Sequence, residues 1–343
     1  MAPNATPDRI MQIGMGFWAS KALLSAVELE LFTALGQGAK TGAEIGDRLG
    51  LHPRSQFDFL DSLVSLGLLE RDGDGPQARY RNTDETAAFL DKSQPSYVGG
   101  ILEMANSRLY GFWDNLTEAL RTGAPQNETK TGGDFFGVLY ADEKRLEEFL
   151  RAMQGIQMGN FLTLLEQVDF SAAATLCDVG GGNGTLCGLA VQRYPHLSAT
   201  VFDLPPVVPV AERHLAAMGV NQRVHVVAGD FFAGELPHAD VIVMGNILHD
   251  WDEEQKTTLI GKAHKALNDG GRLIAIENVI DDARRENTFG LLMSLNMLIE
   301  LPGGFDYTGA QFDGWCLDAG FVRTEIIRLA GPSSAAIAYK NDH

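Results

Sequence analysis

The sequence predicts an α/β domain with a mainly parallel sheet, preceded by a smaller and mainly helical domain. The chain has 343 residues, more than the roughly 150 residues of one average domain. From about residue 171 onward, apolar strand-like runs alternate with helical stretches, which is typical of α/β domains. Residues 1–100 lack this alternation and carry apolar residues at helical spacing instead.

Composition and charge exclude several classes of protein. Hydrophobic residues make up 45% and charged residues 21%, as in ordinary globular proteins. The 27 basic and 45 acidic residues give a net charge of −18, which repels nucleic acid and anionic membranes. Three cysteines without a C-x-x-C pair predict neither a disulfide framework nor a zinc knuckle, and they favour the cytoplasm. We expect no signal peptide and no membrane span, because Lys21 interrupts the apolar stretch 11–27.

The first hundred residues predict a winged helix-turn-helix. The spacing of apolar residues in 10–35 predicts one or two amphipathic helices. Thr41–Glu44 has the form of a capping box that begins the next helix, and Pro53 marks the start of a second helix that runs through Leu69. A turn-rich segment over 71–82 then predicts a hairpin.

Charge argues against DNA binding by this domain. Residues 1–100 contain nine basic and thirteen acidic residues, and the predicted recognition helix carries Asp58 and Asp61 beside a lone Arg54. We therefore predict that 1–100 is a packing or dimerisation domain. Residues 101–170 are helical in pattern and rich in Met and aromatic residues, which predicts a linker that lines a substrate site. The α/β domain then covers 171–343.

Five apolar runs predict the strands of the α/β sheet. They are 175–179, 199–202, 224–228, 239–244 and 272–277. Such nearly continuous apolar runs are typical of parallel strands covered on both faces. Right-handed crossovers place the carboxyl ends of these strands along one edge, where a cofactor is expected to bind.

A glycine-rich turn follows the first of these strands. Asp178 and the next six residues have the pattern D-x-G-x-G-x-G, in which Gly180 and Gly182 permit a tight turn and close approach to a ligand. The dinucleotide fingerprint G-x-G-x-x-G does not fit this segment. A carboxylate at Asp178 would repel a pyrophosphate but suits a cationic amino group. The pattern therefore favours S-adenosylmethionine over NAD.

The next strand ends offer further cofactor ligands. Asp203 lies 21 residues after Gly182 and can accept hydrogen bonds from two ribose hydroxyls. Asp230 follows the third strand and can accept from an adenine amino group, while Phe231 offers an apolar wall to the ring. Asn246, after the fourth strand, completes the predicted cofactor site.

A histidine after the fourth strand is the predicted catalytic base. His249 is the histidine best placed at the cofactor edge, since His264 lies about four helical turns away at 1.5 Å per residue. Glu277 ends the neighbouring fifth strand and is expected to orient the imidazole.

These residues resemble the small-molecule O-methyltransferases, which include plant caffeic-acid and hydroxyindole enzymes and bacterial natural-product tailoring enzymes. The resemblance covers nearly the whole chain. It rests on short motifs, namely Glu30–Phe32, Leu66–Glu70, Asp178–Gly182, Phe202–Pro205, Gly229–Phe232, His249–Trp251, Gly270–Gly271 and Gly303–Gly304. It implies a homodimer with an intertwined N-terminal domain and a Rossmann-like class I methyltransferase domain that converts S-adenosylmethionine to S-adenosylhomocysteine.

The resemblance also implies roles for individual residues. The base falls on His249, and the two supporting acids fall on Glu277 and Asp306. Asp306 is a departure, because the family has a Glu there. The pair of thioethers that clamps the acceptor ring falls on Met153 and Met297. Neighbouring pocket positions fall on Trp113, Met293 and Asn296.

The implied reaction is methyl transfer to a hydroxyl, with a phenol as the expected acceptor. C- or N-methylation on the same scaffold, including metal-assisted keto-acid C-methylation, is a competing hypothesis. Metal-assisted chemistry needs a further His where this chain has Glu300, so we expect no iron or zinc, and the alternative metal site would be His249, Asp250 and Glu300. An enzyme that keeps the cofactor without using its methyl group is a second competing hypothesis, and a ligand-sensing DNA-binding regulator is a third.

Overall fold

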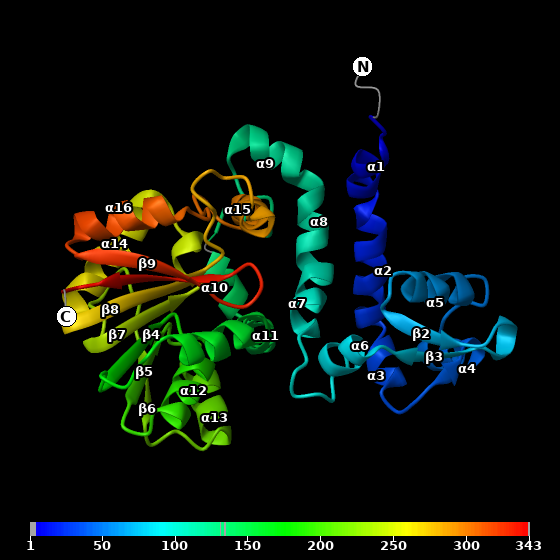
Figure 1. Cartoon of the computed structure of the whole chain (residues 1–343), viewed down its shortest axis with the longest axis horizontal. Helices are drawn as coiled ribbons and strands as arrows, with labels where there is room; N and C mark the ends of the chain where they lie inside the picture. The colour runs from blue at the N-terminus through cyan, green and yellow to red at the C-terminus, as the bar shows by residue number, and fades with distance from the viewer. Residues whose placement is uncertain (1–4, 131, 134, 342–343) are drawn as a thin grey trace. The chain divides into compact units, whose positions relative to one another are not determined.

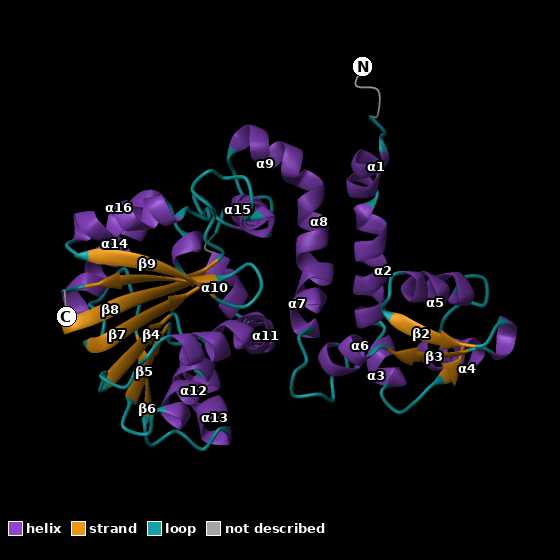
Figure 2. Ribbon diagram, in the orientation of Figure 1, coloured by secondary structure: helices purple, strands orange, loops and turns teal. Residues whose placement is uncertain are grey.

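The computed structural model describes residues 5–130, 132–133 and 135–341. The chain forms two compact units, Met1–Gly111 and Phe112–His343. Their elements are labelled in Figure 1, and Figure 2 separates helices from strands.

The first unit is mainly helical, with one small sheet. Its helices are α1 (Asp8–Gly14), α2 (Gly16–Glu28), α3 (Leu31–Leu35), α4 (Gly42–Leu49), α5 (Gln56–Ser65), α6 (Asp84–Phe89), α7 (Gly99–Met104) and a π-helical turn (Ala105–Leu109) that runs into α8 (Tyr110–Phe112). Strands β1 (Lys40–Thr41), β2 (Leu69–Asp72) and β3 (Arg79–Asn82) pair antiparallel in the order β1-β3-β2, with a short 3-10 turn (Gly75–Gln77) in the hairpin.

The predicted capping box and hairpin of the first unit are confirmed. The Thr41 side chain accepts a hydrogen bond from the Glu44 backbone N–H, and the Glu44 carboxylate accepts one from the Thr41 backbone N–H. The prediction that the following helix begins at Pro53 and runs through Leu69 was wrong. Helix α5 starts later and ends at Ser65, because Leu69 is already the buried first residue of β2.

The N-terminal helices carry an apolar surface that the rest of the first unit leaves uncovered. The most exposed of its large side chains are Ile10, Ile13, Phe17 and Trp18. Over the described residues, Asp8–Glu28 is the one helical stretch long and apolar enough to cross a membrane by length and composition. That is weak evidence for a span, because a helix that buries an apolar face against protein passes the same test.

The second unit is built on a seven-stranded sheet in the order β6-β5-β4-β7-β8-β10-β9. The strands are β4 (Thr175–Val179), β5 (Ser198–Asp203), β6 (Val224–Ala228), β7 (Ala239–Gly245), β8 (Leu267–Glu277), β9 (Arg323–Arg328) and β10 (Ser334–Tyr339). Strands β4 to β8 pair in parallel, as expected, whereas β10 pairs antiparallel with β8 and β9. Sequence analysis missed β9 and β10, because β9 is polar and β10 is rich in alanine.

Helices cover both faces of this sheet. The helices of the second unit are α9 (Leu116–Thr122), α10 (Phe135–Tyr140), α11 (Glu143–Gln167), α12 (Thr185–Arg193), α13 (Val208–Ala217), α14 (Glu253–Ala266), α15 (Thr288–Glu300) and α16 (Gly309–Ala319), with 3-10 turns at Trp113–Asn115 and Leu248–Asp250. One core packs α11, α12 and α13 against one face, and a second packs α14 and α16 against the other. Successive strand residues alternate between the two cores, as Leu176 and Cys177 do.

The parallel strands direct their carboxyl ends toward one edge of the sheet. Their arrowheads point toward the side on which α10 and α11 lie (Figure 2). The glycine-rich turn follows β4, and the turn that carries His249 follows β7. The residues predicted to carry the chemistry therefore meet at this edge.

Candidate active site

A cavity of about 440 Å³ opens at the carboxyl edge of the sheet. Its walls come from the ends of β4, β5, β6 and β7 and from α10 and α11. Four carboxylates line it, those of Asp178, Asp203, Asp230 and Asp250. Among the described residues, no Lys, Arg or His is part of the lining. The cavity is therefore acidic and favours a ligand that carries positive charge.

The glycine-rich turn holds Asp203 in the cavity wall. The Gly182 N–H donates to Asp203 Oδ2 at 2.8 Å, and the Leu204 N–H donates to Oδ1 at 2.7 Å. Gly180 has a φ of +68°, and a Cβ there would lie 2.3 Å from the Ile247 side chain. A larger residue at Gly180 would therefore be strained, and the Ile247 side chain would have to move to admit it.

Burial shifts the titration of the cavity carboxylates Asp178 and Asp203. Burial, with a smaller effect from Asp203, raises the pKa of Asp178 to about 8. Burial also raises the pKa of Asp203 to about 6, against the two backbone N–H groups that favour its charged form. A bound cation would favour ionisation of both groups. These carboxylates thus fit the amino, sulfonium and ribose groups of S-adenosylmethionine.

The other predicted cofactor residues also line the cavity. Phe231 packs edge-on against Trp251, with ring centroids 5.8 Å apart. Asp230 Oδ1 accepts from the Phe232 N–H at 2.7 Å, which fixes its turn. Asn246 adopts a positive φ of 53° in the loop after β7 and faces the same cavity.

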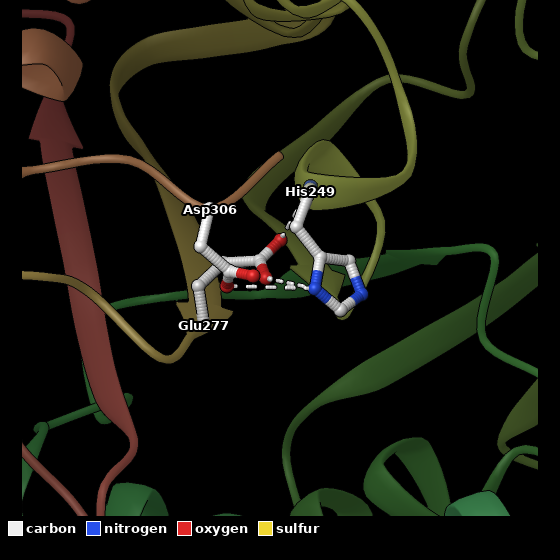
Figure 3. Close-up of side chains that lie close together, drawn as sticks. All are labelled: His249, Glu277 and Asp306. Atoms are coloured by element: carbon white, nitrogen blue, oxygen red, sulfur yellow. Dashed lines mark hydrogen bonds and ion pairs between the residues drawn. The ribbon is translucent and has the colours of Figure 1, made fainter. Parts of the chain in front are cut away.

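Beside the cavity, His249 faces acids at both ring nitrogens, and Figure 3 shows the two acids on the Nδ1 side. Its Nδ1 is 3.5 Å from Asp306 Oδ1 and 3.6 Å from Glu277 Oε2, and all three residues are buried. On the other side of the ring, Nε2 is 3.4 Å from Oδ1 of Asp250, which lines the cavity. Glu277 Oε1 accepts from the Leu248 N–H at 2.9 Å, so the end of β8 fixes the loop that carries His249.

The acids change the proton affinity of the imidazole. Burial lowers the pKa of His249, but the charges of Glu277, Asp250 and Asp306 together raise it to about 10. Burial raises the pKa of Glu277 to about 7 and that of Asp250 to about 6, each opposed by the positive charge on His249. These groups form one coupled cluster that shares its protons.

The structure brings the predicted acid–base residues together and separates part of the predicted acceptor site from the cavity. Met153 lines the cavity. Trp113 Nε1 donates to Asn296 Oδ1 at 2.9 Å, which joins the start of the second unit to α15. Neither these two residues nor Met293 and Met297 line the cavity, and their role toward an acceptor stays a prediction.

Sequence reasoning missed several residues of this site. Asp250 directly follows His249, so its position in the sequence could have marked it as a site residue. Only the structure shows that its Oδ1 lies 3.4 Å from Nε2 of the His249 ring. Tyr140 and Gln157 line the cavity from α10 and α11, and no local motif marks them. Lys256 is completely buried near the acids, where a helix pattern predicts a surface lysine.

His249, Glu277 and Asp306 offer donor atoms within 4.8 Å of one another, a spacing that metal sites share. The imidazole already faces both carboxylates with its Nδ1 and supplies positive charge when protonated. We therefore interpret the trio as an acid–base cluster and do not assign these residues as metal ligands.

Family models match both parts of the chain. Residues 113–322 match the O-methyltransferase domain, and residues 11–92 match the O-methyltransferase dimerisation domain.

Three curated relatives match most of the chain. The tetracenomycin polyketide synthesis 8-O-methyl transferase TcmO of Streptomyces glaucescens is 40% identical over 97% of both chains. The 3-hydroxy-5-methyl-1-naphthoate 3-O-methyltransferase of Streptomyces sahachiroi is 35% identical, covering 96% of this chain and 94% of its own. The N,N-dimethyltransferase OxyT of Streptomyces rimosus is 35% identical over 82% of this chain and 81% of its own.

Two solved structures share the fold. Human N-acetylserotonin methyltransferase in complex with SAM superimposes with a TM-score of 0.91, at 28% identity and full coverage of both chains. PigF with SAH gives a TM-score of 0.86 at 29% identity, covering 98% of this chain and all of the other.

Proposed function

The chain belongs to the O-methyltransferase family and is an S-adenosylmethionine-dependent O-methyltransferase, and on this premise we propose that it methylates a phenolic hydroxyl with His249 as general base. The observation that carries the proposal is the imidazole flanked by acids beside a carboxylate-lined cavity. The names of two relatives, a polyketide and a naphthoate O-methyltransferase, support an aromatic natural product as the acceptor.

Residues of the cavity hold the methyl donor. Bound S-adenosylmethionine supplies an electrophilic methyl group on a sulfonium. Asp178 and the glycine-rich turn bind its amino end, Asp203 binds the ribose hydroxyls, and Asp230 with Phe231 binds the adenine. Because the strand order is β6-β5-β4-β7, these groups run along the edge in the order adenine, ribose, amino acid, and the loop after β7 comes next. That loop carries His249.

His249 removes the acceptor's proton at Nε2, while Glu277 and Asp306 hold Nδ1. A phenol has a pKa near 10 and keeps its proton at pH 7, so transfer to the ring removes a cost from the reaction. The acids raise the pKa of His249 to about 10, so the ring binds that proton about as strongly as the phenol does. Turnover therefore requires an imidazole that has first lost its own proton, and we expect the rate to rise with pH.

Assembly and location follow from the same premise. We propose a homodimer formed through residues 1–100, because residues 11–92 match a dimerisation domain and the side chains of Ile10, Ile13, Phe17 and Trp18 are exposed. Three buried, unpaired cysteines fit a cytoplasmic enzyme of secondary metabolism. We also propose that 101–170 lines the acceptor site and that 171–343 binds the cofactor.

The test is a product assay. Purified protein is incubated with S-adenosylmethionine and a panel of hydroxylated naphthoates, polycyclic aromatic polyketides and hydroxyindoles. The proposal predicts a product about 14 mass units heavier whose new methyl group is shown by NMR to be on a phenolic oxygen. Transfer to carbon or nitrogen alone would contradict it.

N-methylation is the second candidate, because OxyT is named an N,N-dimethyltransferase. Aminated aromatic compounds in the same panel separate the two reactions by the atom that carries the new methyl group. Metal-assisted C-methylation is tested by metal analysis of the purified protein and by turnover after chelation. A bound metal that turnover requires would replace the acid–base interpretation of His249.

A further inference from the structure

The loop that follows β6 carries two residues proposed to bind the adenine of the cofactor. Asp230 and Phe231 lie in this loop, which spans 229–234 outside the helices and strands, and both residues line the cavity. Such a loop must hold its side chains in place before binding, or the ligand must order them at a cost in affinity. The groups that fix the loop therefore influence how tightly the cofactor binds.

Hydrogen bonds within the loop use three of its N–H groups. Asp230 Oδ1 accepts from the Phe232 N–H at 2.7 Å and from the Ala233 N–H at 3.4 Å. The Asp230 carbonyl oxygen accepts from the Gly234 N–H at 2.9 Å. None of these three bonds uses the carbonyl oxygens of Phe231, Phe232 and Gly234, whose partner comes from another element.

One lysine on α14 binds all three of these carbonyl oxygens. Lys262 Nζ donates to the carbonyl oxygens of Phe231 at 2.5 Å, Phe232 at 2.7 Å and Gly234 at 2.7 Å. An ammonium has three N–H donors, so these bonds use its full capacity. Lys262 is half-buried and lies in the third turn of α14, 28 to 31 residues after the carbonyl groups that it binds. Hydrogen bonds from a charged donor are stronger than those between neutral groups, so this contact holds the loop firmly.

Aromatic packing holds the same loop from the side of the His249 turn. The Trp251 ring packs edge-on against Phe231 and Phe232, with ring centroids 5.8 Å and 4.7 Å apart. Apolar packing is less directional than hydrogen bonding, so the three bonds to Lys262 fix the backbone more narrowly. Lys262 does not line the cavity, so it can act on a ligand there only through the loop.

We propose that Lys262 is a positioning residue for the adenine end of the cofactor. By binding three carbonyl oxygens it holds the loop 229–234 so that Asp230 can accept a hydrogen bond from the adenine amino group. The proposal rests on the proposed function, in which Asp230 and Phe231 bind the adenine. Loss of Lys262 should therefore weaken ligands that have the adenine amino group more than ligands that lack it.

The experiment measures by calorimetry the Kd of S-adenosylhomocysteine and of S-inosylhomocysteine, in which a carbonyl oxygen replaces the adenine amino group. We expect the wild type to prefer S-adenosylhomocysteine by about thirtyfold, because the inosyl ligand loses a hydrogen bond to a charged group. Lys262→Met keeps the length of the side chain without its donors. In this variant the Kd of S-adenosylhomocysteine should rise by about tenfold, and the preference should fall below about fivefold.

Three further variants control the comparison. Lys265→Met changes an exposed lysine on the same helix and should leave both Kd values unchanged. Asp203→Ala should weaken both ligands alike and keep the preference, because Asp203 is proposed to act at the ribose. Asp230→Ala should abolish the preference, because it removes the acceptor of the amino group.

A folded Lys262→Met variant that keeps the wild-type preference overturns the proposal, whether both Kd values stay the same or rise alike. A wild type without the preference, or a preference that Asp230→Ala leaves intact, instead contradicts the adenine assignment, and the proposal falls with it. The two failures are thereby distinguished. If Lys262→Met does not fold, Lys262→Gln, which is too short to reach all three carbonyl oxygens, takes its place in the same comparison.

Discussion

The cofactor cavity and the His249 cluster both use carboxylates, but in opposite ways. In the cavity, Asp178 and Asp203 face space that a ligand fills, and backbone N–H groups hold Asp203 in place. In the cluster, Glu277 and Asp306 face a buried imidazole, and the cations that balance them belong to the protein. One set of acids therefore selects a cationic ligand, whereas the other sets the strength of a base.

The largest expected effect comes from removing the base, His249, which should lower turnover without changing cofactor binding. His249→Ala should lower kcat by about 10³, since general-base catalysis contributes roughly 10²–10⁴. The Kd for S-adenosylmethionine should stay the same, because His249 does not line the cavity. Steady-state kinetics with the acceptor found in the panel, together with calorimetry, would check both values. Turnover near that of the wild type would rule out His249 as the base.

The second-largest expected effect comes from a change in the cavity acids and tests whether they bind the cofactor independently of the His249 cluster. Asp203→Ala should weaken S-adenosylmethionine and S-adenosylhomocysteine alike by about thirtyfold, or ~2 kcal/mol, because charged hydrogen bonds to the ribose are lost. At saturating cofactor, kcat should fall much less. Asp169→Ala, at an exposed acid outside the cavity, is the control for calorimetry. If only the S-adenosylmethionine affinity falls, Asp203 acts on the sulfonium charge and not on the ribose.

The two sets also differ in how far the sequence predicts them. Asp178 lies at the end of β4, Gly182 in the turn after it and Asp203 at the end of β5, so a local pattern places them at one edge of the sheet. Asp306 lies in a loop between α15 and α16, and its distance to His249 depends on packing, which no local spacing reveals. Its assignment came only through the family resemblance.

Lys256 shows most clearly what could not be predicted from the sequence. The first turns of α14 contain only polar and charged residues, a pattern that predicts a solvent-exposed lysine. The burial of Lys256 results from Phe305, nearly fifty residues later in the chain, covering it. Long-range packing therefore decides the chemistry of this residue.

A smaller effect concerns the second acid of the cluster. Asp306→Asn should lower kcat by about tenfold, because it removes one of the charges that stabilise the imidazolium. The acid limb of the kcat profile should move to lower pH, since the ring then binds its proton less firmly. Stopped assays from about pH 6 to 10 would measure both changes. A limb that moves to higher pH would contradict the role given to Asp306.

The smallest expected effect is a proton count. Burial raises the pKa of Asp178 to about 8 from an ordinary value of 3.8, so the free protein holds a proton there at pH 7. A cationic cofactor favours the ionised form, so binding should release up to about one proton, and affinity should fall as the pH is lowered. Calorimetry at pH 7 in buffers of different ionisation enthalpy measures this count. Proton uptake on binding would contradict the assignment of Asp178 to the cationic end of the cofactor.

The free protein should show the reverse dependence in its stability. Between about pH 4 and 8 the folded state binds the Asp178 proton that the unfolded state has lost, so the contribution of this group to stability falls as the pH rises. Thermal unfolding across this range, with and without cofactor, would show whether the cofactor removes that loss.

The separation of ligand-binding acids from base-setting acids is tested most directly by a calorimetric titration of the double variant His249→Ala/Glu277→Gln with S-adenosylmethionine. Neither His249 nor Glu277 lines the cavity, so we expect a Kd within about threefold of the wild-type value in a protein without turnover. A Kd weakened by about tenfold or more, in a variant that melts as the wild type does, would show that both sets of acids bind the cofactor as one site.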